Sequence, residues 1–502
     1  MGSKNEDGSR DKSRFSEFAG NGFLPLDNSK TVQSEALLPN EFKDLELNLG
    51  RPRRYWVVTL SILLYGMVFN GTTNGFASPA LVLMQSNQSG DDLVLTDQEL
   101  SWVSSLAGLG YPVGTILSGV LMRYLGRKWA TLTLHCSSYV FGFGLIYLAP
   151  NANWIFLGRF VCGICQGSCN CIIIVYTLEM CINQKQRALV GVLLAVMGYS
   201  GTLFINVLGV FLTWRQLALT SLVMAVPFVV GLIIWVPEAP QYHLSKGQSS
   251  LALNVYDQLF GIHFRPSVQY FLNQGSQMSE DLEAESFQGA QKCQSSLKLL
   301  QALIFMLFYQ FAGYNVICFY AASILQTDAK YINYQSNRSF WHSLDPALVA
   351  AVFVALAGLL GVVFGVYLVQ HFQRKNLLIT SALGTSLAFF ALGVLFEGKK
   401  GNVSNHIGWD LWLPTALLVI HILIFSTGYG SIGFPMLAEM LPPAMRPIGM
   451  SFLTTMGGIF TFANAKSFSD LSGVWGQGLT FIVYGAINFL GAIYIRVCVP
   501  KL

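Results

Sequence analysis

Stretches of about 20 apolar residues recur along most of the chain, and they restrict its possible folds more than any other feature. A helix of this length crosses the hydrocarbon core of a bilayer, which is about 30 Å thick. Inside lipid such a stretch must be helical, because no water is present to satisfy its backbone polar groups. The sequence predicts about twelve such helices, over residues 55–82, 99–122, 129–149, 154–177, 188–210, 217–236, 297–325, 346–370, 376–396, 411–437, 447–467 and 474–497.

The composition also indicates a membrane protein. Hydrophobic residues make up 53% of the 502 residues and charged residues only 11%, whereas a soluble domain carries about 25% charged residues. Most of the surface is therefore expected to face hydrocarbon. The basic residues behind the net charge of +4 are dispersed among the loops, so this charge does not indicate nucleic-acid binding.

Two short charged motifs occur once in each half of the chain, at the same place in a run of six apolar stretches. Duplicated six-helix halves are typical of transporters in which two similar bundles alternate around a central site. We therefore predict an all-α membrane protein with twelve transmembrane helices in two six-helix bundles. The motifs are Gly126-Arg127-Lys128 and Glu179 with Arg187 in the first half, and Gln373-Arg374-Lys375 and Glu439 with Arg446 in the second.

The polarity pattern divides the chain into four parts. A polar N-terminal segment is expected to be disordered, and a long loop between the bundles either latches the halves together or merely connects them. Residues 251–260 of this loop have an amphipathic pattern that predicts a short helix at the membrane interface. The expected parts are residues 1–50 (disordered, cytosolic), 51–237 (first bundle), 238–296 (cytosolic helical linker) and 297–502 (second bundle).

Charge and glycosylation signals agree on one orientation. Lys and Arg gather in alternate loops, whereas the loop after the first apolar stretch carries four acidic residues and no basic one. Because cytosolic loops are the basic ones, we expect both termini in the cytosol, in a protein of the plasma membrane. The sequons at Asn87, Asn337 and Asn402 all fall in loops assigned to the outside, where glycosylation can occur.

None of the nine cysteines lies in a predicted outer loop, so no extracellular disulfide is expected. Cys162, Cys165, Cys169 and Cys171 crowd one apolar stretch, for which metal binding and close helix packing are the two interpretations. Small residues let membrane helices approach closely, and we favour packing. We expect no metal site and no cofactor.

Several motifs together resemble the sugar porter family of the major facilitator superfamily. The end of the sixth stretch reads Pro237-Glu238-Ala239-Pro240-Gln241-Tyr242, close to the family's Pro-Glu-Ser-Pro-Arg-Trp. The seventh contains Gln310-Phe311-Ala312-Gly313-Tyr314-Asn315, close to the family's Gln-x-x-Gly-Ile-Asn. The first stretch, with Gly75 to Leu81, is similar to the insect trehalose-transporter branch. The resemblance covers residues 55–497 and implies the major facilitator fold.

The resemblance also implies that the duplicated charges act as a cytosolic latch. Such charges are expected to pair between the two halves when the inner mouth is closed; the alternative is that they only fix the topology. The motifs depart from the family at Arg123, where Asp is usual, and at Gln373, where Gly is usual. The expected latch residues are Arg127, Lys128, Glu179, Arg187, Glu238, Arg374, Lys375, Glu439 and Arg446.

A sugar site needs a few amide and hydroxyl groups beside an aromatic surface. By resemblance, Gln310 and Asn315 are the best candidates, provided that their helix is bent or broken, which Gly313 permits. The alternative is that these amides bond to neighbouring helices. The expected substrate-binding residues are Gln310, Asn315, Tyr309, Tyr314, Phe434 and His421.

Other positions depart from the family's sugar contacts. Smaller or less polar residues stand where the family has amides, a glutamate or tryptophans, so the resemblance predicts a roomier and less polar pocket. A disaccharide, a polyol or another neutral solute would then fit better than a hexose. The positions are Ala195, Tyr309, Gly358, Ser426, Phe434, Gly457 and Gly458.

Two of the ionisable residues inside predicted spans have two possible interpretations. His421, mid-way along the tenth stretch, is either functional or a neutral histidine bonded between helices. Arg159, near the outer end of the fourth stretch, is expected to extend its guanidinium to the membrane interface.

No carboxylate is placed to carry a proton. Proton-coupled sugar porters have an Asp in the first span, and here that position falls near Thr72. Facilitated diffusion is therefore the simpler mechanism, and neither an ATP-binding P-loop nor the residue set of an enzyme stands out. The leading hypothesis is a uniporter for a sugar such as a hexose or trehalose; the alternatives are a transporter of another neutral organic solute and a non-transporting sugar sensor.

Overall fold

The computed structural model describes residues 54–85, 93–181, 184–260, 289–329, 345–399, 409–442 and 445–499. The expected disordered segment 1–50 and the sequons at Asn87, Asn337 and Asn402 lie outside these residues. Every regular element in the described part of the chain is a helix. The predicted all-α class is therefore confirmed.

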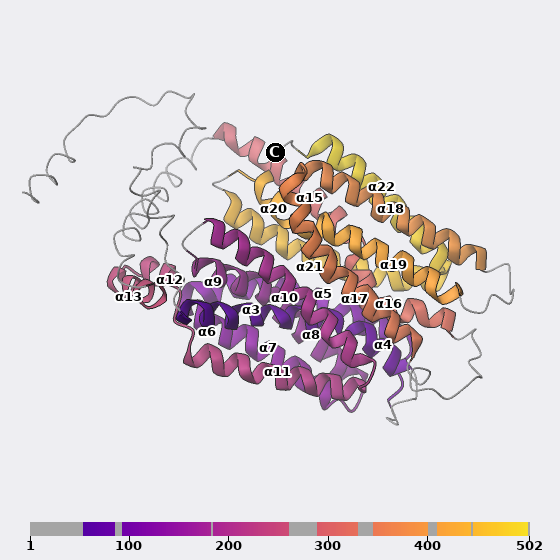
Figure 1. The fold of residues 1–502 in the computed structure, drawn as a ribbon, viewed down its shortest axis with the longest axis horizontal. Coiled ribbons are helices and arrows are strands. Elements are labelled where there is room, and N and C mark those ends of the chain that lie inside the picture. Colours follow the sequence, from indigo (N-terminus) through magenta and orange to yellow (C-terminus); the bar gives the residue numbers. More distant parts are fainter. Residues whose placement is uncertain are drawn as a thin grey trace, which may run out of the picture. The chain divides into compact units, whose positions relative to one another are not determined.

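Six helical stretches make up the first half of the bundle (Figure 1). The third and fourth stretches each contain a π-helical turn, which divides them into shorter labelled pieces. The elements are α3 (Arg54–Gly75) with α4 (Ala77–Gln85), α5 (Asp97–Leu125), α6 (Arg127–Ala130) with η3 (Thr131–Cys136) and α7 (Ser137–Tyr147), α8 (Ala152–Ser168) with η4 (Cys169–Ile173) and α9 (Ile174–Glu179), α10 (Gln184–Gly209) and α11 (Trp214–Ile234).

Six further stretches make up the second half, and two short helices precede them. The linker helices are α12 (Pro240–Ser245) and α13 (Ser249–Phe260). The second half consists of α15 (Gly289–Phe311) with α16 (Tyr314–Ala329), α17 (Pro346–His371), α18 (Arg374–Lys399), α19 (Trp409–Thr427) with α20 (Tyr429–Met440), α21 (Arg446–Trp475) and α22 (Gln477–Cys498).

Ten of the described stretches are long and apolar enough to cross a membrane. The other two, Arg127–Tyr147 and Arg446–Trp475, lie among them in the bundle (Figure 1). Every predicted span has a helical counterpart, but the eleventh runs to Trp475 instead of ending near residue 467. It ends there because Gly476 turns the chain with φ +85°, a conformation that favours glycine.

Local capping explains where several helices begin. The Thr96 hydroxyl accepts a hydrogen bond from the Glu99 amide, while the Glu99 side chain accepts one from the Thr96 amide, so α5 starts with a capping box. Thr213 and Gln216 form the same arrangement at the start of α11. Both caps lie at the end of the bundle opposite the charged motifs. We call the end with Arg127 the motif end and the other the opposite end.

Glycines let the helices of the first half approach until their backbones touch. A Cβ at Gly71 of α3 would lie 1.9 Å from the carbonyl oxygen of Gly198 in α10, and one at Gly201 would lie 2.3 Å from the Val68 oxygen. The same holds for α5 and α8, where a Cβ at Gly163 would lie 2.1 Å from the Ala107 oxygen. In lipid no hydrophobic effect drives helices together, so close packing at small residues stabilises these contacts.

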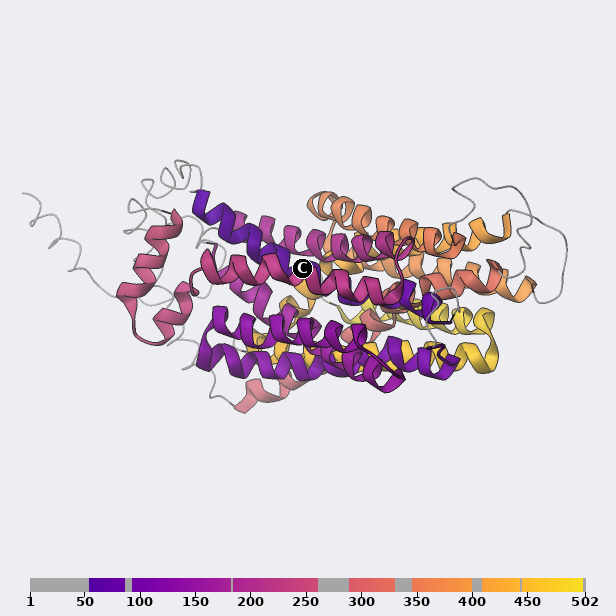
Figure 2. The ribbon, with the colours of Figure 1, turned by 90° about the horizontal axis from the view of Figure 1, so that it is seen from below.

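The linker helix predicted over 251–260 is present as α13. Its apolar residues Ala252, Val255 and Leu259 are buried, and α13 packs against α3 beyond the motif end of the bundle (Figures 1 and 2). The Phe260 ring lies 6.1 Å from the Trp56 ring. The amphipathic face therefore covers the start of the first bundle.

Candidate functional site

The seventh helical stretch is broken at its centre. Helix α15 ends at Phe311 and α16 begins at Tyr314, with Gly313 between them at φ +94°. A side chain there would be strained, and its Cβ would also lie 2.2 Å from the Phe389 ring. The expected break at Gly313 is confirmed, and broken helices of this kind usually mark transporter sites.

The break brings Gln310 and Asn315 together. The Asn315 amide donates to the Gln310 side-chain oxygen at 2.8 Å and lies 3.3 Å from the Thr461 hydroxyl. Thr461 in turn donates to the same Gln310 oxygen at 3.2 Å, and the Asn464 amide donates to the Gln310 backbone carbonyl at 2.7 Å. The two predicted amides therefore form a polar cluster with α21, in which Thr461 and Asn464 are members that the motifs did not reveal.

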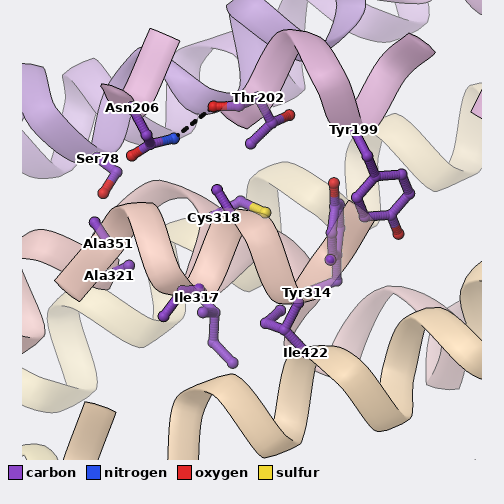
Figure 3. Close-up of a pocket in the computed structure, with 13 residues that line it drawn as sticks. Ser78, Tyr199, Thr202, Asn206, Tyr314, Ile317, Cys318, Ala321, Ala351 and Ile422 are labelled. Carbon is purple, nitrogen blue, oxygen red and sulfur yellow. Dashed lines mark hydrogen bonds between the residues drawn. The ribbon is translucent and has the colours of Figure 1, made fainter. Parts of the chain in front are cut away.

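A cavity lies between α10 of the first half and α16, α17 and α19 of the second (Figure 3). The predicted residue Tyr314 lines it, together with Tyr199, Thr202, Asn206 and Cys318; most of the other lining side chains are apolar. Gln310 and Asn315 are not among the lining residues. The free space is about 10 Å³, which is at the lower limit for one water molecule.

The prediction of a roomier pocket is wrong, because aromatic rings and a methionine occupy the space at the small residues. The Tyr199 ring lies 2.9 Å from where a Cβ at Gly358 would be, and Tyr111 fills the same kind of gap at Gly458. The Met306 methyl group takes the space at Gly457. Tyr199 and Tyr111 belong to no motif, so no sequence signal could have identified them.

The predicted residues Tyr309 and Phe434 belong to an aromatic cluster of the second half. Their ring centroids are 5.5 Å apart in an edge-to-face arrangement, and Tyr309 also lies 6.0 Å from Tyr429. Tyr314 stacks on Phe425 at 5.2 Å. Neither Tyr309 nor Phe434 is among the residues that line the cavity, so their role as the aromatic surface of a sugar site stays a prediction.

His421 contacts the backbone at the helix break. The side chain is fully buried, its Nε2 lies 3.1 Å from the Ala312 carbonyl oxygen, and its ring lies 4.0 Å from the Phe389 ring. The structure therefore places His421 on the backbone of the break and not among the residues that line the cavity.

The prediction that Arg159 extends to the interface is wrong, because the side chain is fully buried. Its Nε donates to the Val103 carbonyl at 2.9 Å and its Nη1 to the Thr73 carbonyl at 3.0 Å. Close packing of α8 against α5 leaves no path to the surface. Backbone carbonyls of α3 and α5 thus accept hydrogen bonds from the guanidinium, which was expected to be hydrated at the membrane interface.

At the motif end, the charged residues of the first half pair with one another. Arg127 holds Glu179 through two hydrogen bonds of 2.8 and 2.9 Å. The Glu238 carboxylate accepts hydrogen bonds from the backbone amides of Arg127 at 2.6 Å and Lys128 at 3.1 Å. Arg187 donates to the Cys181 carbonyl at 3.3 Å.

The motif of the second half repeats this arrangement. Arg374 forms an ion pair with Glu439, Lys375 donates to the Val499 carbonyl, and Arg446 donates to the Leu441 carbonyl at 3.2 Å. Each of these bonds lies within one half, and the pairing expected between the halves when the inner mouth is closed stays a prediction. The duplicated motifs therefore clamp each bundle internally in this conformation.

Glu179→Gln is expected to lower the free energy of unfolding by about 2 kcal/mol, because a partly buried guanidinium loses its ionic partner. The side chains of Arg127 and Glu179 are only 18% and 7% exposed. The matched change Glu439→Gln should cost less than about 1 kcal/mol, because Arg374 and Glu439 are 44% and 31% exposed. Thermal unfolding of the solubilised variants compares the two, and equal losses would contradict this ranking.

Toward the opposite end, polar side chains join the two halves of the chain. The Tyr320 hydroxyl of α16 contacts the Ser104 hydroxyl of α5 and the Ala465 carbonyl of α21. The Lys466 ammonium of α21 donates to Ser101 of α5 at 3.0 Å and lies 4.8 Å from the centre of the Trp102 ring. We call Ser101, Trp102, Ser104, Tyr320 and Lys466 the seam.

The seam was not predicted, although all of its residues lie inside predicted spans and Lys466 falls within the eleventh, 447–467. In the structure, helix α21 continues past this residue, and Asp470 pairs with Lys466 one turn later at 3.0 Å. A charged residue inside a membrane helix is a functional candidate by default. Because the seam joins the halves while the motif-end pairs stay within them, the bundle is closed at the opposite end.

Comparison with known proteins bears on this arrangement. The sequence profile of the sugar (and other) transporter family matches residues 57–502. Facilitated trehalose transporter Tret1 of Apis mellifera ligustica is 27% identical over 484 residues, which are 93% of this chain and 89% of that protein. Tret1 of Drosophila yakuba is 29% identical over 448 residues, which are 89% of this chain. The chain spans only about half the length of the Drosophila yakuba and Drosophila willistoni relatives.

Solved structures with the same fold include two xylose transporters. The xylose transporter XylE from E. coli, in a partially occluded inward-open conformation, matches with a TM-score of 0.70 at 16% identity, covering 89% of this chain and 100% of that chain. A D-xylose–proton symporter matches with a TM-score of 0.67 at 17% identity, covering 89% and 98%. XylE is a major facilitator superfamily protein, so the expected major facilitator fold is confirmed.

Proposed function

Because the chain belongs to the sugar (and other) transporter family, we propose that it carries a small neutral sugar, such as a hexose or trehalose, across the plasma membrane by facilitated diffusion. One observation carries this proposal. A cavity with hydroxyl, amide and aromatic groups but no charged side chain lies between the two halves, beside a helix broken at Gly313. Such a lining suits an uncharged solute with several hydroxyl groups.

The distribution of contacts supports alternating access. The seam joins the halves at the opposite end, whereas the motif-end ion pairs lie within each half. With the basic motif end in the cytosol, this conformation faces inward, and both termini are cytosolic. The loops with Asn87, Asn337 and Asn402 are then extracellular.

The surroundings of Arg159 support transport without protons. Thr72, at the position near which proton-coupled relatives carry an Asp, bonds to the Tyr139 hydroxyl at 2.8 Å, and Arg159 is held by the carbonyls of Val103 and Thr73. A backbone carbonyl does not titrate, so these contacts of α3 and α5 provide no proton-binding group next to the Arg159 guanidinium. The substrate gradient alone then drives transport.

Uptake of labelled glucose, fructose and trehalose tests the proposal, in cells that lack endogenous hexose transport, with and without a pH gradient. We expect saturable uptake that ignores the gradient and falls roughly tenfold or more in Asn315→Ala, because the polar cluster loses the amide that donates to the Gln310 side-chain oxygen. Asn376→Ala, at an exposed position of α18, is the matched control and should transport normally. All variants are compared at equal surface level.

Absence of uptake of all three sugars at normal surface level would overturn the sugar proposal. A competition panel of other neutral solutes would then separate transport of a different substrate from a sensing role. Uptake that follows the pH gradient would overturn facilitated diffusion while leaving a sugar as the substrate.

A further inference from the structure

Tyr199 reaches from the first half of the chain into the second. Its ring lies against Gly358 of α17, where a Cβ would be 2.9 and 3.0 Å from two ring carbons. Its hydroxyl is 3.4 Å from the Ser426 hydroxyl of α19 and 3.1 Å from where a Cβ at Gly430 of α20 would lie. One large side chain therefore fills a gap left by three small residues of the other half.

The ring also forms one end of the cavity. Figure 3 shows Tyr199 and Tyr314 side by side at one end and Ser78 and Asn206 at the other, and the two tyrosine rings are 5.5 Å apart. The space left among these side chains is about 10 Å³. A sugar is many times larger than the single water molecule that such a space holds, so the position of this ring limits what can enter.

The gap at Gly358 is complementary to an aromatic ring. Any side chain at Gly358 would overlap Tyr199, whereas a smaller residue at 199 would leave the gap empty. Packed interiors contain few such voids. The first half therefore contributes Tyr199 to this end of the cavity, beside Tyr314 of the second half.

We propose that Tyr199 is a specificity-determining residue, which restricts the site to solutes with a single sugar ring. The inference rests on the proposed function and narrows it, because a second ring would need the volume that the tyrosine occupies. The chain then prefers a monosaccharide to a disaccharide such as trehalose.

Uptake of labelled trehalose and labelled glucose, measured in the same cells at equal surface level, tests this preference. The wild-type chain should take up glucose in preference to trehalose. Tyr199→Ala should raise the trehalose-to-glucose ratio roughly tenfold, the size of effect that reshaping an apolar pocket produces. Tyr199→Phe keeps the ring and should leave the ratio unchanged. Tyr124→Ala, where the tyrosine is 67% exposed, is the matched control.

The reverse substitution gives a second, independent measurement. Gly358→Ala should reduce uptake of both sugars, because its Cβ meets the Tyr199 ring, and Tyr199→Ala in the same chain should restore uptake. If Tyr199→Ala fails to reach the surface, Tyr199→Leu removes the ring with less loss of packing and takes its place.

The outcomes separate this inference from the proposed function. Glucose uptake by the wild type with an unchanged ratio in Tyr199→Ala overturns the size restriction alone. Equal uptake of trehalose and glucose by the wild type overturns it as well. If the wild type, the Tyr124→Ala control and the Tyr199 variants take up neither of these sugars nor fructose, the proposed function is overturned, and the size restriction with it.

Discussion

Gly201→Leu is expected to destabilise the protein by roughly 3 kcal/mol or more, because it forces α10 away from α3. A Cβ at Gly201 would lie 2.3 Å from the Val68 carbonyl oxygen and 3.1 Å from the Gly71 Cα. Both contacts are with backbone, which cannot rotate out of the way as a side chain can. The two helices must therefore separate along their whole contact.

The same helix offers a matched control for this change. Gly191→Leu introduces the same side chain ten residues earlier in α10, where no atom lies within 4 Å of the new Cβ. We expect it to change the free energy of unfolding by no more than about 0.5 kcal/mol. Thermal unfolding of the solubilised proteins measures both, and similar losses would show that the contact between α10 and α3 does not decide the outcome.

Lys466→Met is expected to raise the population of molecules with an open seam roughly tenfold. The substitution removes the hydrogen bond to Ser101 and the cation–π contact with Trp102, which together are worth about 1–2 kcal/mol. A difference of this size shifts a two-state equilibrium by about a factor of ten. The Lys466–Asp470 pair lies within α21, so it does not itself hold the halves together.

The opening can be followed by thiol labelling. A cysteine placed at Ser104, which is fully buried at the Tyr320 contact, should react about tenfold faster in Lys466→Met than in the otherwise unchanged chain. Lys466→Arg keeps the charge over the Trp102 ring and should label slowly. Solubilised protein is used, so neither a substrate nor an orientation in the membrane is needed. Equal labelling rates in all three chains would show that Lys466 does not hold the seam closed.

The fold was predictable because membrane spans can be recognised in a sequence from their length and apolar composition. The eighth span was expected over 346–370 and begins and ends within a residue of this in α17, Pro346–His371. The eleventh was expected over 447–467, which includes Lys466 but ends before Asp470, whereas α21 runs to Trp475. Their partners lie on α5 or one turn away in α21, and a sequence window does not contain tertiary contacts.

The candidate site was predictable only where residues belonged to a motif. Gln310, Asn315 and the break at Gly313 followed from one short run of sequence. Tyr199 did not, because a single tyrosine in an apolar helix is ordinary until its neighbours on other helices are known. The prediction of a roomy pocket failed for the same reason, since small residues on one helix say nothing about the ring that fills the space.

Helix α13 belongs physically to the first half, although the sequence assigns it to the connection between halves. Its residues Ala252, Val255 and Leu259 are covered by neighbouring parts of the chain, and Phe260 meets Trp56 at the beginning of α3. A cut ahead of Ser249 would separate α13 from the fragment that contains α3 and expose its apolar face to water. A cut after Phe260 keeps α13 in the same fragment as α3. A division of the protein into two co-expressed fragments therefore belongs after Phe260 and not ahead of Ser249.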